Sequence, residues 1–402
     1  MKKQKKWMKF RHKVITKLAS WVLYPYTRLK YHIKIEKFRE QGNRQYLVIM
    51  NHQTAFDQFF VGFAFRGPVY YIASEDLFSN GFISTLLRYA VAPIPIKKQT
   101  TDISAVKNCI RVAREGGTIA LAPEGNRTYS GKTEYMKPAI AKLVKALKLP
   151  LAIFRIEGGY GVHPRWSDVV RRGSMRAYVS KVVEPEDYKG LSDTELMDMI
   201  QRELYVDEGQ VTGEFHHKEL AQYLERAMYV CPDCGLTTFE SHGDVITCKT
   251  CNKQIRYLPT KELEGVNCSF PFRFVTEWYE YQCDFINNLD YAEYVQIPAY
   301  RDKAALYRVI LNKNKELLDE DVQLCLYGDR ITLKGAKTDL LVPFDSAQAV
   351  TVLGRNKLNM YLDGDVYQIK SGKRFNALKY VNFFHRYKNC KEGNEDGKFL
   401  GL

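Results

Sequence analysis

Short apolar runs alternate with stretches of helical periodicity between about residues 44 and 205. Apolar, β-branched runs predict strands at 46–50, 69–73, 91–96, 118–122, 151–156 and 174–183. Apolar residues spaced three or four apart predict helices near 56–66, 80–88, 101–115, 137–147 and 192–204. This alternation predicts an α/β domain over residues 44–205, in which functional loops follow the carboxyl ends of the strands.

From about residue 300 the pattern changes to short strands separated by turns. The strands are predicted at Val322–Tyr327, Arg330–Lys334, Thr338–Pro343, Ala347–Leu353, Lys357–Leu362 and Val366–Ser371, followed by a helix at Asn376–His385. We therefore expect a mostly β domain at 300–392 and a tail at 393–402. Antiparallel strands closed by one helix resemble a pleckstrin-homology (PH) or GRAM-like module. That resemblance implies lipid or partner binding, with Arg355, Lys357 and Lys373 as exposed cations, although a scaffolding role is equally open.

Two cysteine pairs lie between these regions. Cys231-Pro-Asp-Cys234 and Cys248-Lys-Thr-Cys251 are separated by thirteen residues, which lets two tight turns present four thiolates to one ion. Such a site favours structural Zn²⁺, with iron as the open alternative. Residues 206–260 are therefore expected to form a helical lead-in and a zinc ribbon. Residues 261–299 are expected to form an aromatic-rich helical connector.

The first 43 residues are predicted to be basic and amphipathic. Residues 1–40 carry thirteen Lys and Arg against two acids, which accounts for 11 of the formal charge of +14. A helix expected over 5–24 places its apolar side chains on one face and its lysines mostly on the other: Trp7, Phe10, Val14, Leu18 and Trp21 form the apolar face. This pattern suits an anionic membrane surface, although a helix packed on its own protein has the same periodicity. Nucleic acid is not expected, because the aromatic residues face away from the lysines.

Other features of the chain indicate a compartment. No run reaches the roughly 18 uncharged apolar residues of a membrane-spanning helix, and no secretory-signal pattern is present. Nine cysteines, four of them in CxxC pairs, fit a reducing cytosol. We therefore expect a cytoplasmic protein that is peripheral (monotopic) on the inner face of the cell membrane.

Two polar motifs follow predicted strands of the α/β domain. Asn51-His52-Gln53-Thr54-Ala55-Phe56-Asp57 places an imidazole and a carboxylate five positions apart. Ala122-Pro123-Glu124-Gly125-Asn126-Arg127 places a carboxylate, a glycine and a guanidinium after another strand. A base, a group that orients it and an anion-binding corner are the parts that acyl or phosphoryl transfer requires. The sequence therefore indicates an enzyme.

The two motifs resemble conserved blocks of the glycerolipid acyltransferase family, typified by 1-acylglycerol-3-phosphate acyltransferases. NHQTAFD matches its Asn-His-x4-Asp block and APEGNRT is similar to its Pro-Glu-Gly-Thr-Arg-Ser block, while 91–98 and 149–153 lie where the family has its second and fourth blocks. The resemblance covers residues 1–205. It implies transfer of a fatty acyl group from acyl-CoA or acyl carrier protein to a lysophospholipid, with 1-acyl-sn-glycerol-3-phosphate as the expected acceptor. Another amphiphilic alcohol, or a non-catalytic membrane-tethered binding platform, stays open.

The catalytic roles follow from this resemblance. His52 would remove the proton of the acceptor hydroxyl, because imidazole is the side chain best suited to accept a proton at neutral pH. Asp57 would orient the ring and stabilise the imidazolium. The substrate hydroxyl is itself the nucleophile, so no activated serine or cysteine is required.

Substrate binding is expected from the second motif and from a lysine pair. Arg127 would grip the acceptor phosphate, since its planar fork matches phosphate oxygens, although alone it could instead form an ion pair with Glu124. Glu124 would accept a hydrogen bond from the glycerol backbone or fix Arg127. Gly125 would permit close approach to the ligand. Lys97 or Lys98 would add a phosphate contact, although the family has arginine there.

Overall fold

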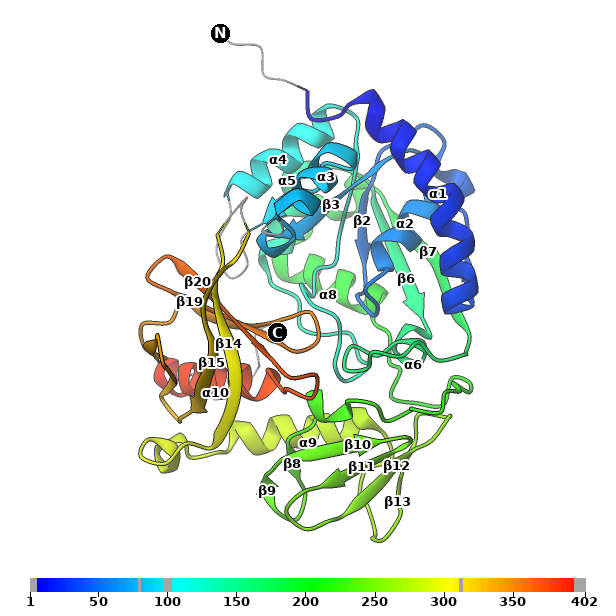
Figure 1. Cartoon of the computed structure of the whole chain (residues 1–402). Helices are drawn as coiled ribbons and strands as arrows, with labels where there is room; N and C mark the ends of the chain where they lie inside the picture. The colour runs from blue at the N-terminus through cyan, green and yellow to red at the C-terminus, as the bar shows by residue number, and fades with distance from the viewer. Residues whose placement is uncertain (1–5, 79–80, 97–102, 311–313, 394–402) are drawn as a thin grey trace.

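The computed structural model describes residues 6–78, 81–96, 103–310 and 314–393 (Figure 1). An α/β domain is followed by a small antiparallel ribbon and then by a β-rich domain that ends in a helix. Within the described part of the chain, no helix combines the length and the apolar character needed to cross a membrane.

The α/β domain is built on a seven-stranded sheet with the order β1-β7-β6-β2-β5-β3-β4. Its strands are β1 (Ile33–Ile35), β2 (Leu47–Met50), β3 (Val69–Ser74), β4 (Ile94–Ile96), β5 (Thr118–Leu121), β6 (Leu151–Glu157) and β7 (Met175–Val183). Neighbours from β6 to β4 are parallel, whereas β7 runs antiparallel to β6. The carboxyl ends of the central strands therefore meet at one edge of the sheet, where both polar motifs lie.

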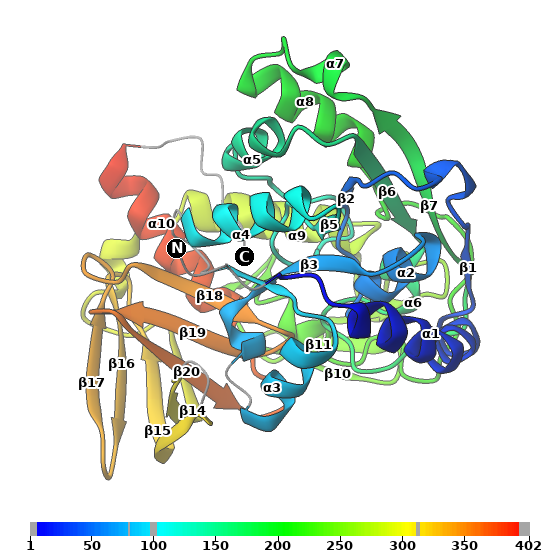
Figure 2. The ribbon, with the colours of Figure 1, turned by 90° about the horizontal axis from the view of Figure 1, so that it is seen from above.

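Both faces of this sheet are covered, which explains the uninterrupted apolar strands. Leu47 and Ile49 of β2 pack into one core and Val48 and Met50 into another. Figure 2 shows α4 and α5 on one side of the sheet and α1 on the other. The helices are α1 (Phe10–Tyr31), α2 (Asp57–Ala64), α3 (Gly81–Ala90), α4 (Ile103–Arg114), α5 (Ala139–Leu147), α6 (Gly159–Val162), α7 (Pro185–Tyr188) and α8 (Asp193–Leu204). Each predicted strand and helix of residues 44–205 is present, with ends within three residues of the prediction.

The amino-terminal helix differs from its prediction. It begins at Phe10 rather than at residue 5, continues to Tyr31 and contains Pro25. Trp7 precedes it and packs on the domain, because its indole Nε1 donates to the Ala92 carbonyl at 3.1 Å and its backbone N–H donates to Glu115 at 2.9 Å. Trp7 is therefore not part of the apolar helix face on which we expected it.

The predicted helical lead-in at 206–227 is wrong. These residues are irregular apart from a 3-10 turn at Leu224–Arg226. Glycines such as Gly209 and Gly213 weaken helix formation here, and tertiary contacts take its place. Glu208 pairs with Lys261 at 3.0 Å, with both side chains buried, and the Phe215 ring fills the space beside Gly161.

The ribbon extends further along the chain than predicted. It consists of β8 (Val230–Cys231), β9 (Gly235–Leu236), β10 (Phe239–His242), β11 (Val245–Cys248), β12 (Gln254–Tyr257) and β13 (Leu263–Gly265). Because β13 pairs with β12, the start of the predicted helical connector is a strand. The α-helix of this region is α9 (Val275–Asn287).

The carboxyl-terminal domain is mostly β, as predicted. Its antiparallel sheet has the order β17-β16-β15-β14-β20-β19-β18 and is followed by a helix. The elements are β14 (Tyr300–Arg308), β15 (Glu316–Leu326), β16 (Arg330–Gly335), β17 (Asp339–Pro343), β18 (Ala349–Leu353), β19 (Lys357–Leu362), β20 (Asp365–Ser371) and α10 (Leu378–Glu392). The relation to PH or GRAM-like modules stays a prediction.

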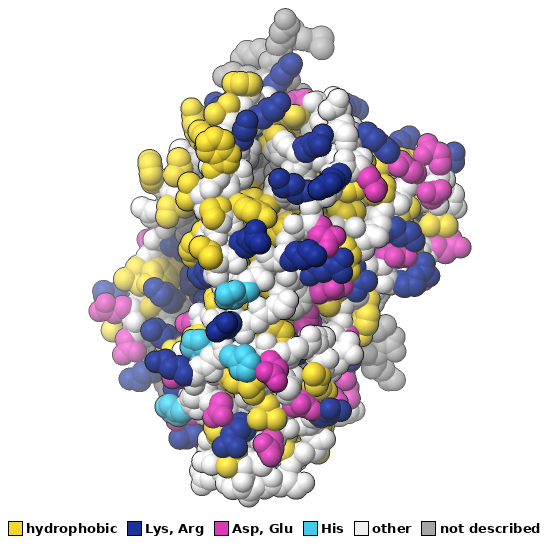
Figure 3. All heavy atoms as spheres, turned by 90° about the vertical axis from the view of Figure 1, so that its right-hand side faces the viewer, with side chains coloured by type: hydrophobic (Ala, Val, Ile, Leu, Met, Phe, Trp, Pro, Cys, Tyr) yellow, Lys and Arg dark blue, Asp and Glu magenta, His cyan; other side chains and the backbone are white. Residues whose placement is uncertain are grey.

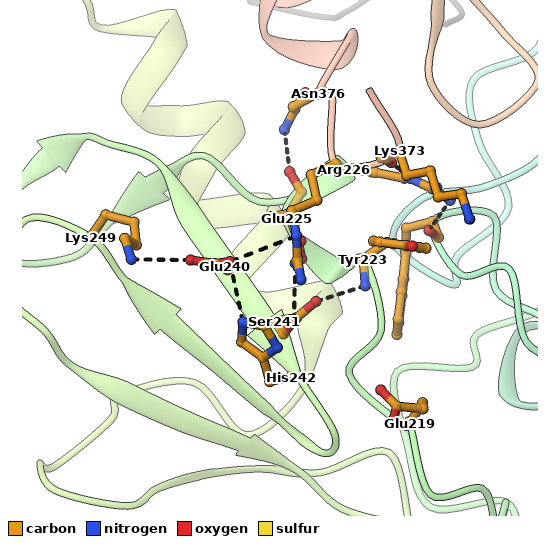
Figure 4. Close-up of polar contacts among 12 residues, drawn as sticks. Glu219, Tyr223, Glu225, Arg226, Glu240, Ser241, His242, Lys249, Lys373 and Asn376 are labelled. Atoms are coloured by element: carbon orange, nitrogen blue, oxygen red, sulfur yellow. Dashed lines mark hydrogen bonds and ion pairs between the residues drawn. The ribbon is translucent and has the colours of Figure 1, made fainter. Parts of the chain in front are cut away.

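The three regions share one core. Tyr129, Tyr160 and Trp166 of the α/β domain belong to the same buried cluster as the ribbon, α9 and the carboxyl-terminal sheet. Figure 4 shows polar contacts between the segment before the ribbon and the carboxyl-terminal domain: Arg226 Nε donates to the Lys373 carbonyl at 2.6 Å, and Asn376 Nδ2 donates to the Glu225 carbonyl at 2.9 Å. The carboxyl-terminal domain is thus fixed against the loops of the α/β domain.

Candidate active site

His52 and Asp57 lie together at the carboxyl end of β2. His52 belongs to the loop after this strand and Asp57 is the first residue of α2, so five residues bring the two side chains face to face. The distance between His52 Nδ1 and Asp57 Oδ2 is 2.8 Å. Asp57 is fully buried, whereas the His52 side chain is 23% exposed. With Nδ1 held by the carboxylate, Nε2 is the ring nitrogen that is free to serve a substrate.

The loop between these residues holds the Asp57 carboxylate in place. The backbone N–H of Gln53 donates to Oδ2 at 2.7 Å. Thr54 donates its hydroxyl to Oδ1 at 2.6 Å and its backbone N–H to the same carboxylate at 3.0 Å. These bonds fix both oxygens of the side chain. The carboxylate therefore has one orientation, and it sets the orientation of the imidazole.

Asn51 and Glu124 fix the His52 loop from its two sides. Asn51 donates to the Ile156 carbonyl and accepts from the Ile156 N–H, both at 2.8 Å, which joins the ends of β2 and β6. The Glu124 carboxylate accepts the backbone N–H of His52 on one oxygen and that of Glu134 on the other, each at 2.8 Å. Burial raises the pKa of Glu124 well above its usual range, while the two N–H donors act in the opposite direction. Glu124 is thus a positioning residue for the histidine loop.

Gly125 and Arg127 form the turn after β5. Gly125 adopts a φ of 72° and donates to the Ala122 carbonyl at 3.0 Å, so its backbone conformation explains the glycine. Arg127 is only 8% exposed, and among the described residues it forms no ion pair with Glu124. Its Nη1 has no hydrogen-bond partner in the described part of the chain. Burial lowers the pKa of Arg127 to about 9, and the charges of Arg165 and Arg355 lower it further, while Asp57 opposes them.

The carboxyl-terminal domain reaches this site through the turn between β18 and β19. Arg165 donates to the Arg127 carbonyl at 2.8 Å and to the Gly354 carbonyl at 2.9 Å, so one buried guanidinium joins the two segments. Arg355 donates to His163 Nε2 at 2.7 Å and pairs with Asp168 at 3.1 Å. Arg355 was expected to be an exposed cation, and this is wrong, because its side chain is 29% exposed and faces the α/β domain.

His163 is a neutral residue of this cationic environment. Its Nδ1 lies 3.3 Å from the Tyr31 hydroxyl of α1, while Nε2 accepts from Arg355. Burial lowers the pKa of His163 to about 3, and the charges of Arg355, Arg127 and Lys30 act in the same direction. The unprotonated ring can therefore serve as an acceptor for Arg355 at neutral pH.

Part of this chain is similar to known acyltransferases. Residues 29–156 match a family model described as Acyltransferase, and this stretch contains both polar motifs. This part of the chain is therefore similar to the acyltransferase family. Over 127 residues the chain is 21% identical to the 1-acyl-sn-glycerol-3-phosphate acyltransferase of Bacillus subtilis, covering 32% of this chain and 60% of that protein. The crystal structure of the 1-acyl-sn-glycerophosphate acyltransferase PlsC from Thermotoga maritima is 20% identical, with a TM-score of 0.40, and the match covers 48% of this chain and 79% of that chain.

Sequence reasoning about the acyltransferase domain found some of the site and missed the rest. His52 contacts both Asp57 and Glu124, and the turn that carries Gly125 and Arg127 adjoins the His52 loop, whereas Lys97 and Lys98 lie outside the described residues. The roles of these residues stay predictions. Missed were the groups that complete the polar environment: Asn51, His163, Arg165 and Arg355. Asn51 belongs to a motif already singled out, so its contact with β6 could have been sought. No sequence signal links Arg355 to this site.

The four cysteines of the ribbon form a separate cluster. The sulfur atoms of Cys231, Cys234, Cys248 and Cys251 all lie within 4.8 Å of one another, and none is in a disulfide. Thiolates around one tetrahedral ion are about 3.8 Å apart when each bond is about 2.3 Å. The positive φ values of Gly235 (69°) and Asn252 (59°) fit the turns that follow each pair. These residues could hold one metal ion, and such a four-sulfur shell leaves no open position for catalysis.

Proposed function

We propose that this acyltransferase moves a fatty acyl group from acyl-CoA or acyl carrier protein to the free hydroxyl of a lysophospholipid. The expected acceptor is 1-acyl-sn-glycerol-3-phosphate and the expected product is phosphatidate. The observation that carries the proposal is the His52–Asp57 pair, with 2.8 Å between Nδ1 and Oδ2, beside the buried guanidinium of Arg127. The chain matches only 60% of the length of the curated relative, so its donor and acceptor are both part of the proposal.

In this mechanism His52 acts first as a base and then as an acid. Nε2 takes the proton from the acceptor hydroxyl as its oxygen attacks the thioester carbonyl. Asp57 holds Nδ1 and stabilises the imidazolium that forms. When the tetrahedral intermediate collapses, the carbon–sulfur bond breaks and the thiolate takes the proton from His52. Arg127 would hold the acceptor headgroup so that its hydroxyl stays at the imidazole.

We also propose that α1 and α3 rest on an anionic membrane surface that supplies the acceptor. Both helices carry exposed apolar side chains, including Phe10 at 81%, Trp21 at 71% and Phe82 at 80% exposure. They are neighbours, because Arg11 of α1 donates to the Tyr89 carbonyl of α3 at 3.0 Å. Figure 3 views the molecule from the α1 side, where hydrophobic side chains gather beside many Lys and Arg side chains. Apolar contact with a basic border suits the headgroup layer of anionic lipid.

For the cysteine cluster we propose structural Zn²⁺. Four thiolates from two turns are the ligand set that zinc prefers in closed sites. The ion would brace the ribbon, whose apolar side chains share a core with Tyr129 of the acyltransferase domain.

The test of the proposed reaction is acyl transfer by the purified chain. Each labelled donor type is paired with a panel of lysophospholipids and a glycolipid, so that the panel separates lysophosphatidate from other amphiphilic acceptors. His52→Ala should lower kcat by about 10²- to 10⁴-fold, the usual contribution of a general base. Arg127→Ala should mainly raise KM for the acceptor. The matched control is His216→Ala, which alters an exposed histidine outside the site.

Two outcomes would reject the proposal. His52→Ala and Arg127→Ala variants that transfer acyl chains at the wild-type rate would remove the catalytic assignment. A wild-type chain that transfers to no acceptor, while still binding anionic vesicles, would favour the membrane-tethered binding platform.

A further inference from the structure

The turn between β18 and β19 is held by the acyltransferase domain as well as by its own sheet. Tyr129 donates its hydroxyl to the Arg355 carbonyl at 3.1 Å, and Arg165 donates to the Gly354 carbonyl at 2.9 Å. On the same turn, the Arg355 side chain donates to His163 at 2.7 Å. Backbone and side chain of Arg355 are thus both fixed by residues of the acyltransferase domain.

Several arginine side chains meet at this junction. The charges of Arg165 and Arg355 both act on Arg127, and the carboxylate that pairs with Arg355 is Asp168. Asp168 is shared, because Arg226 also binds it at 2.7 Å. The negative charge of Asp57 acts on the Arg127 guanidinium. The Asp57 oxygens, however, already accept hydrogen bonds from His52 and from the loop after His52. Glu134 also acts on Arg165, but burial raises the pKa of Glu134, which disfavours its charged form. Clustered guanidinium groups beside so weakly charged a carboxyl favour an anion between them.

Unused donors point to the same conclusion. Nη1 of Arg127 and Nε of Arg355 are both buried and have no hydrogen-bond partner among the described residues. A buried N–H without a partner costs free energy, and an incoming acceptor oxygen would remove that cost. Arg127 is more than nine-tenths buried, so its charge cannot be satisfied by bulk water.

We propose that Arg355 of the carboxyl-terminal domain binds the phosphate of the acyl acceptor together with Arg127, so that the acceptor site spans two domains. This proposal rests on the proposed function and names the acceptor class: lysolipids that end in a phosphate monoester. A monoester carries between one and two negative charges near neutral pH and offers three oxygens, enough to accept from both Arg127 Nη1 and Arg355 Nε. A phosphodiester headgroup carries one charge and offers fewer free oxygens, so it gains less from a second arginine.

The experiment compares three variants of the full chain with the wild type. Arg355→Gln removes the charge, Arg355→Lys keeps the charge but loses the planar fork, and Arg301→Gln alters an exposed arginine on β14 as the matched control. Acyl transfer is measured at a saturating concentration of one donor. The acceptors are lysophosphatidate, its phosphodiester analogue lysophosphatidylglycerol, and monoacylglycerol, all with the same acyl chain.

We expect Arg355→Gln to raise KM for lysophosphatidate by about 10- to 100-fold, the effect of losing a charge-assisted contact, with kcat within about threefold. KM for monoacylglycerol should change by less than about twofold, since that acceptor has no phosphate. The phosphodiester should be affected to an intermediate extent. Arg355→Lys should recover part of the loss, and Arg301→Gln should match the wild type.

Several results would overturn this proposal. Equal losses on all three acceptors would mean that Arg355 only holds the domains together. A rise in KM for the donor with an unchanged KM for lysophosphatidate would assign the anion to the donor. If the wild type transfers to no acceptor, the proposed acyl transfer is rejected, but binding of an anion by Arg355 is still testable. Calorimetric binding of inorganic phosphate to wild type and Arg355→Gln is then the test. The proposal requires Arg355→Gln to bind phosphate at least about tenfold more weakly than wild type, and equal binding rejects it.

Discussion

Replacing Asp57 by asparagine tests the catalytic pair with almost no change of shape. Every group around the carboxylate donates a hydrogen bond: His52 Nδ1 at 2.8 Å, the Gln53 N–H at 2.7 Å and the Thr54 hydroxyl at 2.6 Å. An amide offers one oxygen and one NH₂ group. If the NH₂ group replaces Oδ2, it faces the Gln53 N–H, and two buried donors then oppose each other at a cost of about 1–3 kcal/mol. If the NH₂ group replaces Oδ1 instead, the Thr54 hydroxyl can turn to accept from it, and only the Thr54 N–H opposes it. The amide oxygen should therefore face His52, so that the ring keeps its orientation and loses its counter-charge.

The size of this loss follows from the distance. With 2.8 Å between Nδ1 and Oδ2, the centres of the two charges in the imidazolium state lie about 4 Å apart. At an effective dielectric constant of about 20, that attraction is worth about 4 kcal/mol. Each 1.4 kcal/mol is about tenfold in rate, so kcat of Asp57→Asn should fall by about 10³-fold. His52 is partly exposed, so solvent screens the attraction between the two charges. The expected fall in kcat therefore lies between about 10²- and 10³-fold.

The assay is kcat for acyl transfer at saturating donor and acceptor, with circular dichroism to verify that the variant is folded. Asp198→Asn, which changes an exposed aspartate on α8, is the matched control. The same substitution is then made in the His52→Ala background, where Asp57 no longer has a ring to orient and its replacement should cost less than about threefold. A folded Asp57→Asn enzyme within tenfold of wild type would refute the reasoning. So would an undiminished loss in the His52→Ala background.

Three further predictions concern pH, metal and membrane. The folded pKa of His163, about 3, is below the ordinary value of 6.5, so the unfolded chain binds the proton first and stability is lost as pH falls below about 6.5. Between pH 7 and pH 5 the free energy of unfolding should fall by about 2 kcal/mol through this residue. Urea unfolding at the two pH values should therefore show a smaller fall for His163→Gln than for wild type, and equal falls would contradict this prediction. Cys251→Ser should lower both the zinc content, measured by elemental analysis, and the Tm, because it removes one of the four sulfur ligands. The control Cys268→Ser should change neither. Full zinc content in Cys251→Ser would exclude the four-cysteine site. Trp21→Ser should weaken binding to anionic vesicles in a sedimentation assay, and unchanged binding would remove α1 from the membrane face.

The parts of the fold that could be predicted are those that local sequence determines. Leu47–Met50 is apolar at every position, which a strand covered on both faces requires, and α/β topology follows from such strands alternating with amphipathic helices. The His52–Asp57 contact was predictable for the same reason. A strand end and the first turn of the next helix are five residues apart, so the chain leaves little freedom for the two side chains to separate.

What could not be predicted depends on long-range partners. Residues 206–227 were expected to be helical from local pattern, but the buried Glu208–Lys261 pair and the packing of Phe215 stabilise an irregular path. Glu124 was expected to contact Arg127 or the substrate, yet its oxygens accept the N–H groups of His52 and Glu134. In each case, the competing interaction comes from a segment that no local periodicity identifies.

The contacts of Arg165 make the two halves of the chain energetically dependent on each other. Its guanidinium donates to the carbonyls of Arg127, Gly354 and Val352, so it binds the site loop and the β18–β19 turn at once. Separating the domains would leave the Arg165 cation with fewer partners and the Gly354 and Val352 carbonyls without this donor, and it would expose Tyr129, which shares a core with the carboxyl-terminal sheet. The His52–Asp57 contact is local and does not need that sheet. The position of Arg127 does, because the loop that carries it is held from the other side by the carboxyl-terminal domain.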